Sequence, residues 1–410
     1  MGANKLLAIV ALGVAVRLAF GLGYWVDQPL TRDEREYLSL ARSLRAGDGF
    51  VYDEGHTDPF GRAPGYPAFL AVAGGGHGNP ASVPALVKIT QSLIGALGIL
   101  LAAALAARLA GPRAAMMAAL FTAGYPPLVW ISAYAFSEAI FWPLGLLVAW
   151  LFDRASTASS PASRVRLALV CGALAGAGVL IRPALLFFLL LAALYWMWRR
   201  RWAPLVALTI GALVMVGPWT ARNYAVHGRF VLVASEGGVT FWTGNHPLAI
   251  GEGDMAANQA IKRDSLALRA RHPALSEEAM EPVYYREAFA WIRAHPLDWL
   301  ALQARKVFYT VVPIGPSYRL HSRLYVAASL ASYGLALAGA LVGLWRWRDR
   351  LHTVTGLWLL AGSAVLVCLA FFPQERFRIP VIDPALLVLA AAACVPRWPN
   401  PPAAAAKVAA

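Results

Sequence analysis

Ten long apolar runs, separated by short polar or basic segments, constrain the fold of this chain more than any other feature. A helix needs roughly 20 apolar residues to cross a bilayer core about 30 Å thick. Hydrophobic residues make up 59% of the 410 positions and charged residues only 14%, whereas a soluble domain carries about 25% charged residues. The sequence therefore predicts an all-α polytopic membrane protein with spans at residues 5–25, 85–109, 114–131, 136–152, 165–181, 183–198, 204–219, 324–345, 353–372 and 379–395.

Basic residues occupy every second gap between these spans. If the N-terminus is cytoplasmic, each cytoplasmic connection is basic and nearly free of acids, as the positive-inside rule requires. The net charge of +14 then reflects membrane topology and gives no reason to expect a nucleic-acid partner. We predict a multi-pass protein of the cell membrane, with its long loops on the outer face. The bases that define the inner face are Arg108, Arg113, Arg154, Arg164, Arg166, Arg199, Arg200, Arg201, Arg346, Arg348 and Arg350, with Arg397 and Lys407 in the tail.

The spans divide the chain into six parts. We expect a first transmembrane helix (1–25), an outer loop with interfacial helices (26–84), a transmembrane bundle (85–219), an outer segment (220–323), the C-terminal transmembrane helices (324–395) and a disordered cytoplasmic tail (396–410). Residues 230–233 and 239–242 are predicted to pair as short strands around Gly237-Gly238, and residues 282–312 follow a helical pattern. The outer segment is therefore expected to be a small mixed α/β unit.

The first span carries Arg17 in its middle and has no clear small-x-small cleavage site. It is therefore predicted to be a retained anchor and not a signal peptide. A guanidinium inside a bilayer must face the bundle interior or water, because lipid does not tolerate it.

A run of charged residues follows the first span almost immediately. Thr31 and Glu34 have the spacing of a capping box, so a helix is predicted to begin there with Asp33 and Glu34 in its first turn. Asp33 and Tyr37 would then share one face of that helix. Acids at this position have two explanations: they complement the helix dipole, or they form a functional site beside the membrane.

Further acids and arginines lie at the predicted outer ends of other spans. Glu138, Arg182 and Arg378 occupy such ends, where polar residues also occur for topological reasons alone. Taken together with Asp33 and Arg62, they predict a cavity that opens outward, with carboxylates on one side and guanidinium groups on the other. Guanidinium groups bind phosphate in a bidentate manner, and phosphate at a membrane surface usually belongs to a lipid head group.

Several motifs resemble the protein O-mannosyltransferase-like group of lipid-dependent glycosyltransferases, which includes the aminoarabinose transferases that modify lipid A. These motifs extend over nearly the whole chain, and their number and order carry the resemblance better than any one alone. They are Asp33-Glu34-x-x-Tyr37, Arg62-x-Pro64-Gly65-Tyr66-Pro67, Ser137-Glu138, Arg182-Pro183, Pro218-Trp219-x-x-Arg222-Asn223-Tyr224, Gly237-Gly238, Gly244-Asn245-x-Pro247, His295-Pro296, Lys306 and Arg376-x-Arg378-x-Pro380.

The resemblance implies the glycosyltransferase C superfold and transfer of a single sugar, a hexose or a pentose, from a polyprenyl-phosphate donor to an acceptor on the outer face. It implies that Asp33 is the catalytic base, and the adjacent Glu34 is expected to be a catalytic residue with it. A sugar on a lipid phosphate already has a good leaving group, so one base and cations for the departing phosphate suffice. Displacement from the opposite face would invert the anomeric centre.

The remaining residues are given supporting roles. Arg378 is expected to be the main phosphate ligand, with Arg376 and Arg182 behind it. Glu138 is expected to position the acceptor or the sugar, and Tyr37 to shape the first loop together with Arg62, which can also reach phosphate.

No cofactor is expected. The eight histidines form neither an H-x-x-H nor an H-E-x-x-H pattern, and His56, His227 and His246 are interpreted as solvated loop residues and not as metal ligands. The expected partners are the lipid-linked donor, membrane lipids and an envelope glycan, lipid or protein acceptor.

Two other functions remain open at the level of sequence. A transporter or lipid flippase would explain the many spans and Arg17, although transporters often contain internal repeats and none is found here. A binding or assembly scaffold would depend on the outer segment and not on Asp33.

Overall fold

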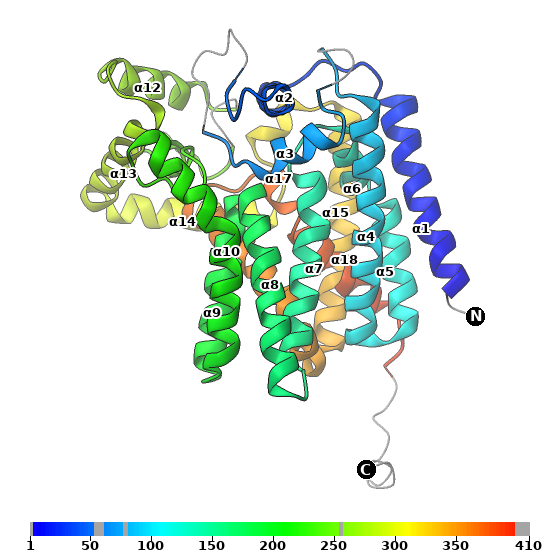
Figure 1. Cartoon of the computed structure of the whole chain (residues 1–410). Coiled ribbons are helices and arrows are strands. Elements are labelled where there is room, and N and C mark those ends of the chain that lie inside the picture. The colour runs from blue at the N-terminus through cyan, green and yellow to red at the C-terminus, as the bar shows by residue number, and fades with distance from the viewer. Residues whose placement is uncertain (1–2, 53–60, 77–80, 254–256, 398–410) are drawn as a thin grey trace.

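The structure is a computed structural model that describes residues 3–52, 61–76, 81–253 and 257–397, and every regular element in those ranges is helical (Figure 1). The membrane bundle consists of α1 (Ala3–Leu18), α4 (Ala85–Ala110), α5 (Pro112–Gly124), α6 (Pro126–Trp130), α7 (Glu138–Ser156), α8 (Pro161–Ile181), α9 (Leu186–Trp198), α10 (Trp202–His227), α15 (Arg323–Arg346), α16 (Thr355–Ala370) and α18 (Ile382–Ala393). The elements that cover one end of it are α2 (Arg32–Ala46), α3 (Gly65–Val72), α11 (Gly237–Gly244), α12 (Gln259–Ala270), α13 (Glu277–Ala294), α14 (Pro296–Val311) and α17 (Glu375–Arg378).

In the part of the chain that the structure describes, fewer helices are long and apolar enough to cross a membrane than the ten spans that the sequence predicts. Among the described residues, seven helices are long and apolar enough to cross a membrane, and an eighth span results if α5 and α6, which meet at an angle of 61°, form one broken crossing. Helices α9 and α18 are apolar but shorter. The predicted span at residues 379–395 runs through Pro380, which lies at the break before α18 because proline interrupts helical hydrogen bonding, and the helix that follows is short.

The outer segment is helical, so the predicted pair of short strands is wrong. Residues 239–242 lie inside α11. The residues just before α11 are held by side chains of α10 instead of by a partner strand: Trp219 Nε1 donates to the Val233 carbonyl at 2.8 Å, and Asn223 Nδ2 donates to the Val231 carbonyl at 3.0 Å. These backbone carbonyls are satisfied without a sheet, which removes the need for one.

Arg17 lies inside the bundle and hydrogen-bonds to the C-terminal end of α5, at the break between α5 and α6. Its guanidinium donates to the carbonyls of Ala123 and Thr122, both at 3.2 Å, and to that of Gly13 at 2.9 Å. The last carbonyls of a helix have no partner in their own helix, and in a bilayer no water replaces one. The intramembrane charge therefore has a structural role, and a transport pathway is not needed to explain it.

Close helix packing in the bundle depends on glycine. A Cβ atom on Gly172 of α8 would overlap the carbonyl oxygen of Leu208 in α10, and one on Gly211 of α10 would overlap that of Leu169 in α8. Small residues let membrane helices approach until their backbones touch.

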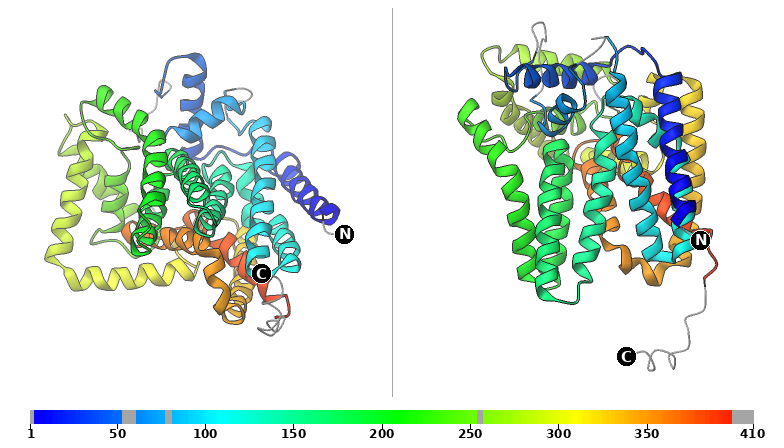
Figure 2. Two further views of the ribbon diagram at one scale, coloured as in Figure 1. Left: turned by 60° about the horizontal axis from the view of Figure 1, so that its bottom comes forward. Right: turned by 45° about the vertical axis from the view of Figure 1, so that its right-hand side comes forward.

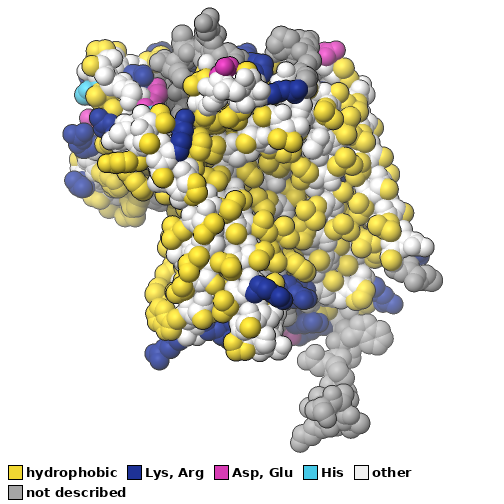
Figure 3. All heavy atoms as spheres, in the orientation of Figure 1, with side chains coloured by type: hydrophobic (Ala, Val, Ile, Leu, Met, Phe, Trp, Pro, Cys, Tyr) yellow, Lys and Arg dark blue, Asp and Glu magenta, His cyan; other side chains and the backbone are white. Residues whose placement is uncertain are grey.

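The two ends of the bundle differ in character. The first residue described in α1 and the basic connections between the spans lie at one end, while α2, α3 and α12 lie at the other (Figures 1 and 2). Hydrophobic side chains dominate the surface of the bundle, and Lys and Arg side chains gather near its lower end (Figure 3).

Candidate active site

Helix α2 places Asp33 at the covered end of the bundle. The predicted capping box is present: the Glu34 amide donates to Thr31 Oγ1, and Glu34 Oε2 accepts from the Thr31 amide at 2.8 Å. Glu34 Oε1 accepts from the Ala135 amide at 3.0 Å, which ties α2 to the bundle. Both oxygens of buried Glu34 are therefore engaged in packing α2, and burial raises the pKa of this carboxyl. Among the described residues, the hydrogen-bond partners of the Glu34 carboxylate are Thr31 and Ala135, and the ion pairs of Asp33 are with Arg62 and Arg376.

Each carboxylate oxygen of Asp33 is paired with a guanidinium. Arg62 Nη2 lies 2.8 Å from Oδ1, and Arg376 Nη1 lies 2.6 Å from Oδ2. Burial alone would raise the pKa of Asp33, but the positive charges of Arg62 and Arg376 outweigh it and hold the pKa well below its usual range. Asp33 is thus a fixed carboxylate, and its side chain remains 28% exposed.

Arg62 is the buried centre of this arrangement. Besides Asp33 it contacts Glu36, at 2.8 Å through Nε, and Glu236, at 2.9 Å through Nη1. Its guanidinium lies over the ring of Tyr37, 5.2 Å from the centroid. Three carboxylates and an aromatic ring therefore fix Arg62, and the side chain is only 8% exposed.

Glu138 connects the other two arginines. Its Oε1 lies 3.0 Å from Arg376 Nε and 2.5 Å from Arg182 Nη1. Arg376 also stacks on Phe136, 4.0 Å from the ring centroid. A continuous set of ion pairs, here called the Asp33 network, thus joins Glu236, Arg62, Glu36, Asp33, Arg376, Glu138 and Arg182.

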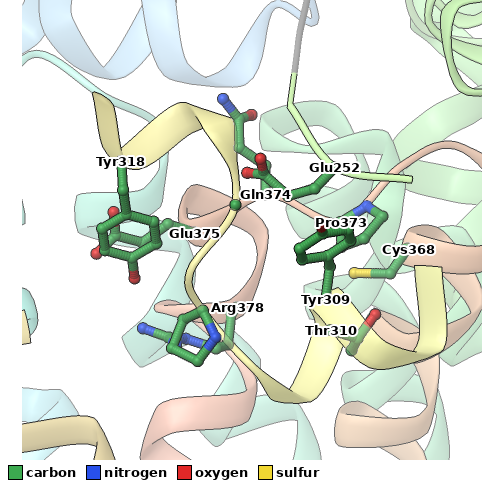
Figure 4. Close-up of a pocket in the computed structure, with 11 residues that line it drawn as sticks. Glu252, Tyr309, Thr310, Tyr318, Cys368, Pro373, Gln374, Glu375 and Arg378 are labelled. Carbon is green, nitrogen blue, oxygen red and sulfur yellow. The ribbon is translucent and has the colours of Figure 1, made fainter. Parts of the chain in front are cut away.

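Arg378 lies apart from the Asp33 network. Its Nε is 3.0 Å from Asp383 Oδ1, and its guanidinium is 3.8 Å from the ring centroid of Tyr333. Residues two apart on a helix face different directions, so on α17 Arg376 reaches Asp33 while Arg378 does not. Arg378 instead lines a pocket, shown in Figure 4, with Glu252, Tyr309, Thr310, Pro313, Gly315, Tyr318, Cys368, Pro373, Gln374 and Glu375.

Glu236 is a member of the network that the sequence did not single out. It precedes α11, and the only sequence feature that pointed to this position is the adjoining Gly237-Gly238 motif. Burial raises its pKa, although the charge of Arg62 opposes this. Asp383, the partner of Arg378, was also missed because it lies within a run interpreted as an ordinary span.

Two other residues of the sequence motifs, Lys306 and Asn245, contact each other outside the Asp33 network. Lys306 is buried on α14, where its Nζ donates to Asn245 Oδ1 at 3.2 Å and to the Leu369 carbonyl at 2.9 Å. Burial lowers the pKa of Lys306 to about 7. These contacts attach the outer segment to the end of α16.

Metal binding has no obvious location in the described ranges, which contain no group of three or more His, Cys, Asp or Glu side chains suited to hold an ion. His246 lies 3.6 Å from Asp264, and His227 lies 3.7 Å from Glu278. His56 is outside the described residues.

Comparison with known proteins identifies the fold. No protein-family model and no curated protein sequence matches the chain. Among solved structures, it is similar to the oligosaccharyltransferase AglB of Archaeoglobus fulgidus, with a TM-score of 0.55 and 14% identity over 95% of this chain and 49% of that one. It is also similar to ArnT of Cupriavidus metallidurans, with a TM-score of 0.48 and 14% identity over 96% of this chain and 78% of that one.

The chain therefore spans about half the length of the archaeal protein it resembles. The likeness to this oligosaccharyltransferase is consistent with the family that the sequence motifs resemble. At this level of identity the likeness concerns architecture alone: this chain shares its fold with part of the archaeal protein.

Proposed function

We propose that this protein is a membrane glycosyltransferase that moves one hexose or pentose from a polyprenyl-phosphate donor to an acceptor on the outer face of the cell membrane. The observation that carries the proposal is Asp33, a partly exposed carboxylate held between two guanidinium groups at the covered end of the bundle. The fold supports it, since one structure of AglB is in complex with an inhibitory peptide and a dolichol-phosphate.

The reaction needs a base and a site for the leaving phosphate. In the proposed step, an acceptor oxygen attacks the anomeric carbon while the bond from that carbon to the phosphate oxygen breaks. The bonding electrons leave with the phosphate, and Asp33 takes the acceptor proton. Attack opposite to the leaving group inverts the anomeric centre.

Arg376 is the best-placed ligand for that phosphate. Its side chain is 29% exposed, compared with 8% for Arg62, and it lies against both Asp33 and Glu138. A donor phosphate that bound Arg376 would leave Asp33 with Arg62 as its remaining partner. The pKa of Asp33 would then rise toward its usual range, so the base would strengthen when the donor is bound.

The other site residues take graded roles in this proposal. Arg182 supports Arg376 through Glu138 and is the second candidate for the phosphate. Arg378 ranks third, because it lies on the other side of α17 and is already paired with Asp383. Glu34 and Tyr37 position the first loop.

The deciding experiment uses the purified full chain in lipid with a panel of radiolabelled polyprenyl-phosphate hexoses and pentoses. Release of polyprenyl phosphate and transfer of label into a crude envelope fraction are measured. For Asp33→Asn we expect the rate to fall by about 10²- to 10⁴-fold, the usual contribution of a general base, while the donor still binds.

Normal transfer by Asp33→Asn would refute the role of Asp33. If no donor in the panel releases polyprenyl phosphate, but donor crosses the membrane in vesicles containing the protein, the chain is a transporter or flippase instead.

A further inference from the structure

Helix α14 has two faces with different surroundings. One face packs inward: Leu302, Lys306 and Thr310 are buried at a spacing of four residues. This face carries the contacts of Lys306 with Asn245 and Leu369. The buried face thus accounts for these contacts of α14 with the rest of the protein, and the opposite face takes no part in them.

The opposite side of α14 is an exposed apolar stripe. It consists of Leu297, Leu300, Val307, Phe308 and Val311, which are 78%, 55%, 52%, 50% and 47% exposed. Their spacing of three and four residues places them along one side of the helix, together with the small residues Ala301 and Ala304. The charged residues Asp298 and Arg305 lie to one side of this stripe.

A stripe of this kind is not suited to water. Large apolar side chains left in water forgo the favourable free energy of burial, and soluble surfaces rarely keep such residues contiguous. An amphipathic helix with one apolar face is typical of segments that lie in the plane of a membrane interface.

The position of α14 indicates what covers the stripe. Exposed apolar residues continue beyond the helix at Ile314, Leu320 and Leu324. Leu324 is in the first turn of α15, which is long and apolar enough to cross the membrane. Helix α14 lies across the direction of the spans and projects beside them (Figures 1 and 2). Exposed apolar side chains thus recur along the chain from α14 to α15, a helix that is long and apolar enough to cross the membrane.

We infer that α14 lies within the outer leaflet, with the Leu297–Val311 stripe among the acyl chains of the membrane that the bundle crosses. The outer segment would then rest on lipid through this helix. Tyr309 and Thr310, which line the Arg378 pocket, would be held at the level of the lipid head groups.

The test uses nitroxide spin labels on the full chain in nanodiscs of phosphatidylethanolamine and phosphatidylglycerol. Cys394, the exposed cysteine of the described residues, is replaced by alanine, and single cysteines are introduced as Leu300→Cys, Val307→Cys and, on the polar side of the same helix, Asp298→Cys. We expect labels at 300 and 307 to collide mainly with oxygen, which concentrates in the acyl region, and the label at 298 to collide mainly with a water-soluble nickel chelate.

Two results would overturn the inference. In the first, the nickel chelate reaches positions 300 and 307 as freely as position 298, which places the stripe in water. In the second, labels at 300 broaden one another and the broadening disappears on dilution with unlabelled protein, which assigns the stripe to a second copy of this chain.

An experiment on the unaltered chain removes any dependence on the variants. Phospholipids with a photoreactive diazirine in the acyl chain are irradiated in the same nanodiscs, and cross-linked peptides are mapped by mass spectrometry. Adducts on both α14 and α15 are expected. Adducts on α15 without any on α14 would contradict the inference, whatever the enzymatic activity of the protein.

Discussion

At the scale of single residues, the most informative feature is that both oxygens of Asp33 are already occupied by guanidinium groups. A carboxylate so paired stays ionised to low pH and is a weak base. In the proposed mechanism the two arginines have different tasks: buried Arg62 keeps Asp33 in place, and the more exposed Arg376 changes partner when the donor phosphate binds.

This division predicts the pH dependence of Arg376→Gln. An aspartate is active as a base above its pKa. Because the pKa of Asp33 in the free enzyme is depressed, we expect kcat/KM, measured with varied donor, to stay constant down to about pH 4. Removing the Arg376 charge raises that pKa, and the acid limb of kcat/KM should move to higher pH. The rate should also fall by about 10²- to 10³-fold, as for loss of one charge-stabilising donor.

Arg182→Gln is the matched control, because Arg182 contacts Glu138, whereas Asp33 is paired with Arg62 and Arg376 in the described structure. It should lower the rate without moving the acid limb. An identical acid limb in the wild type and in Arg376→Gln would show that Arg376 does not tune Asp33.

Most of the acids and arginines of the Asp33 network could be found in the sequence, but Glu236 and the pairing of these residues could not. Arg376 and Arg378 are the same residue type two positions apart, and the sequence favoured Arg378 for the phosphate. Which of them faces Asp33 depends on the orientation of α17, which is set by packing and not by local pattern.

At the scale of secondary-structure elements, Arg17 shows how the bundle accommodates a broken helix. In Arg17→Met the carbonyls of Thr122 and Ala123 lose the donor seen here. We expect the free energy of unfolding, measured in mixed micelles with increasing dodecyl sulfate, to fall by at least about 1–3 kcal/mol.

Arg166→Met, at an exposed position on α8, is the control and should have a much smaller effect. Equal stability of wild type and Arg17→Met would show that the break does not need the guanidinium.

Glycine packing gives a second prediction at this scale. Gly172→Ala introduces a Cβ into the backbone contact between α8 and α10, so we expect a loss of about 1–3 kcal/mol from overpacking. Gly334→Ala on α15 adds a Cβ with no described heavy atom within 4 Å and should be neutral or slightly stabilising. Thermal unfolding of the two variants in the same detergent makes the comparison, and equal midpoints would argue against close α8–α10 contact.

At the scale of the whole molecule, the Asp33 network connects the first loop, the bundle and the outer segment through side chains. Arg62 contributes the link to the outer segment through Glu236, and Arg376 contributes the link to the bundle through Glu138. The candidate site is thus completed only when all three parts are assembled.

The orientation of the whole molecule can be tested with single cysteines. Positive charges favour the cytoplasmic side, so Arg200→Cys should react with a membrane-impermeant maleimide only after the membrane is opened. Leu266→Cys, at an exposed position on α12, should react in intact spheroplasts. The reverse pattern would place the Asp33 network in the cytoplasm and would exclude transfer on the outer face.

The sequence by itself determined that the chain is a polytopic helical membrane protein, where its apolar runs lie, and which end of the bundle is basic. Hydrophobicity and charge are local properties, so these conclusions needed no knowledge of contacts. The helical outer segment, the capping of a broken helix by Arg17 and the pairing of Asp33 with Arg376 instead of Arg378 were decided only by the tertiary structure. The ion pair between Asp33 and Arg376 joins residues 343 positions apart, and no local pattern encodes a contact of that range.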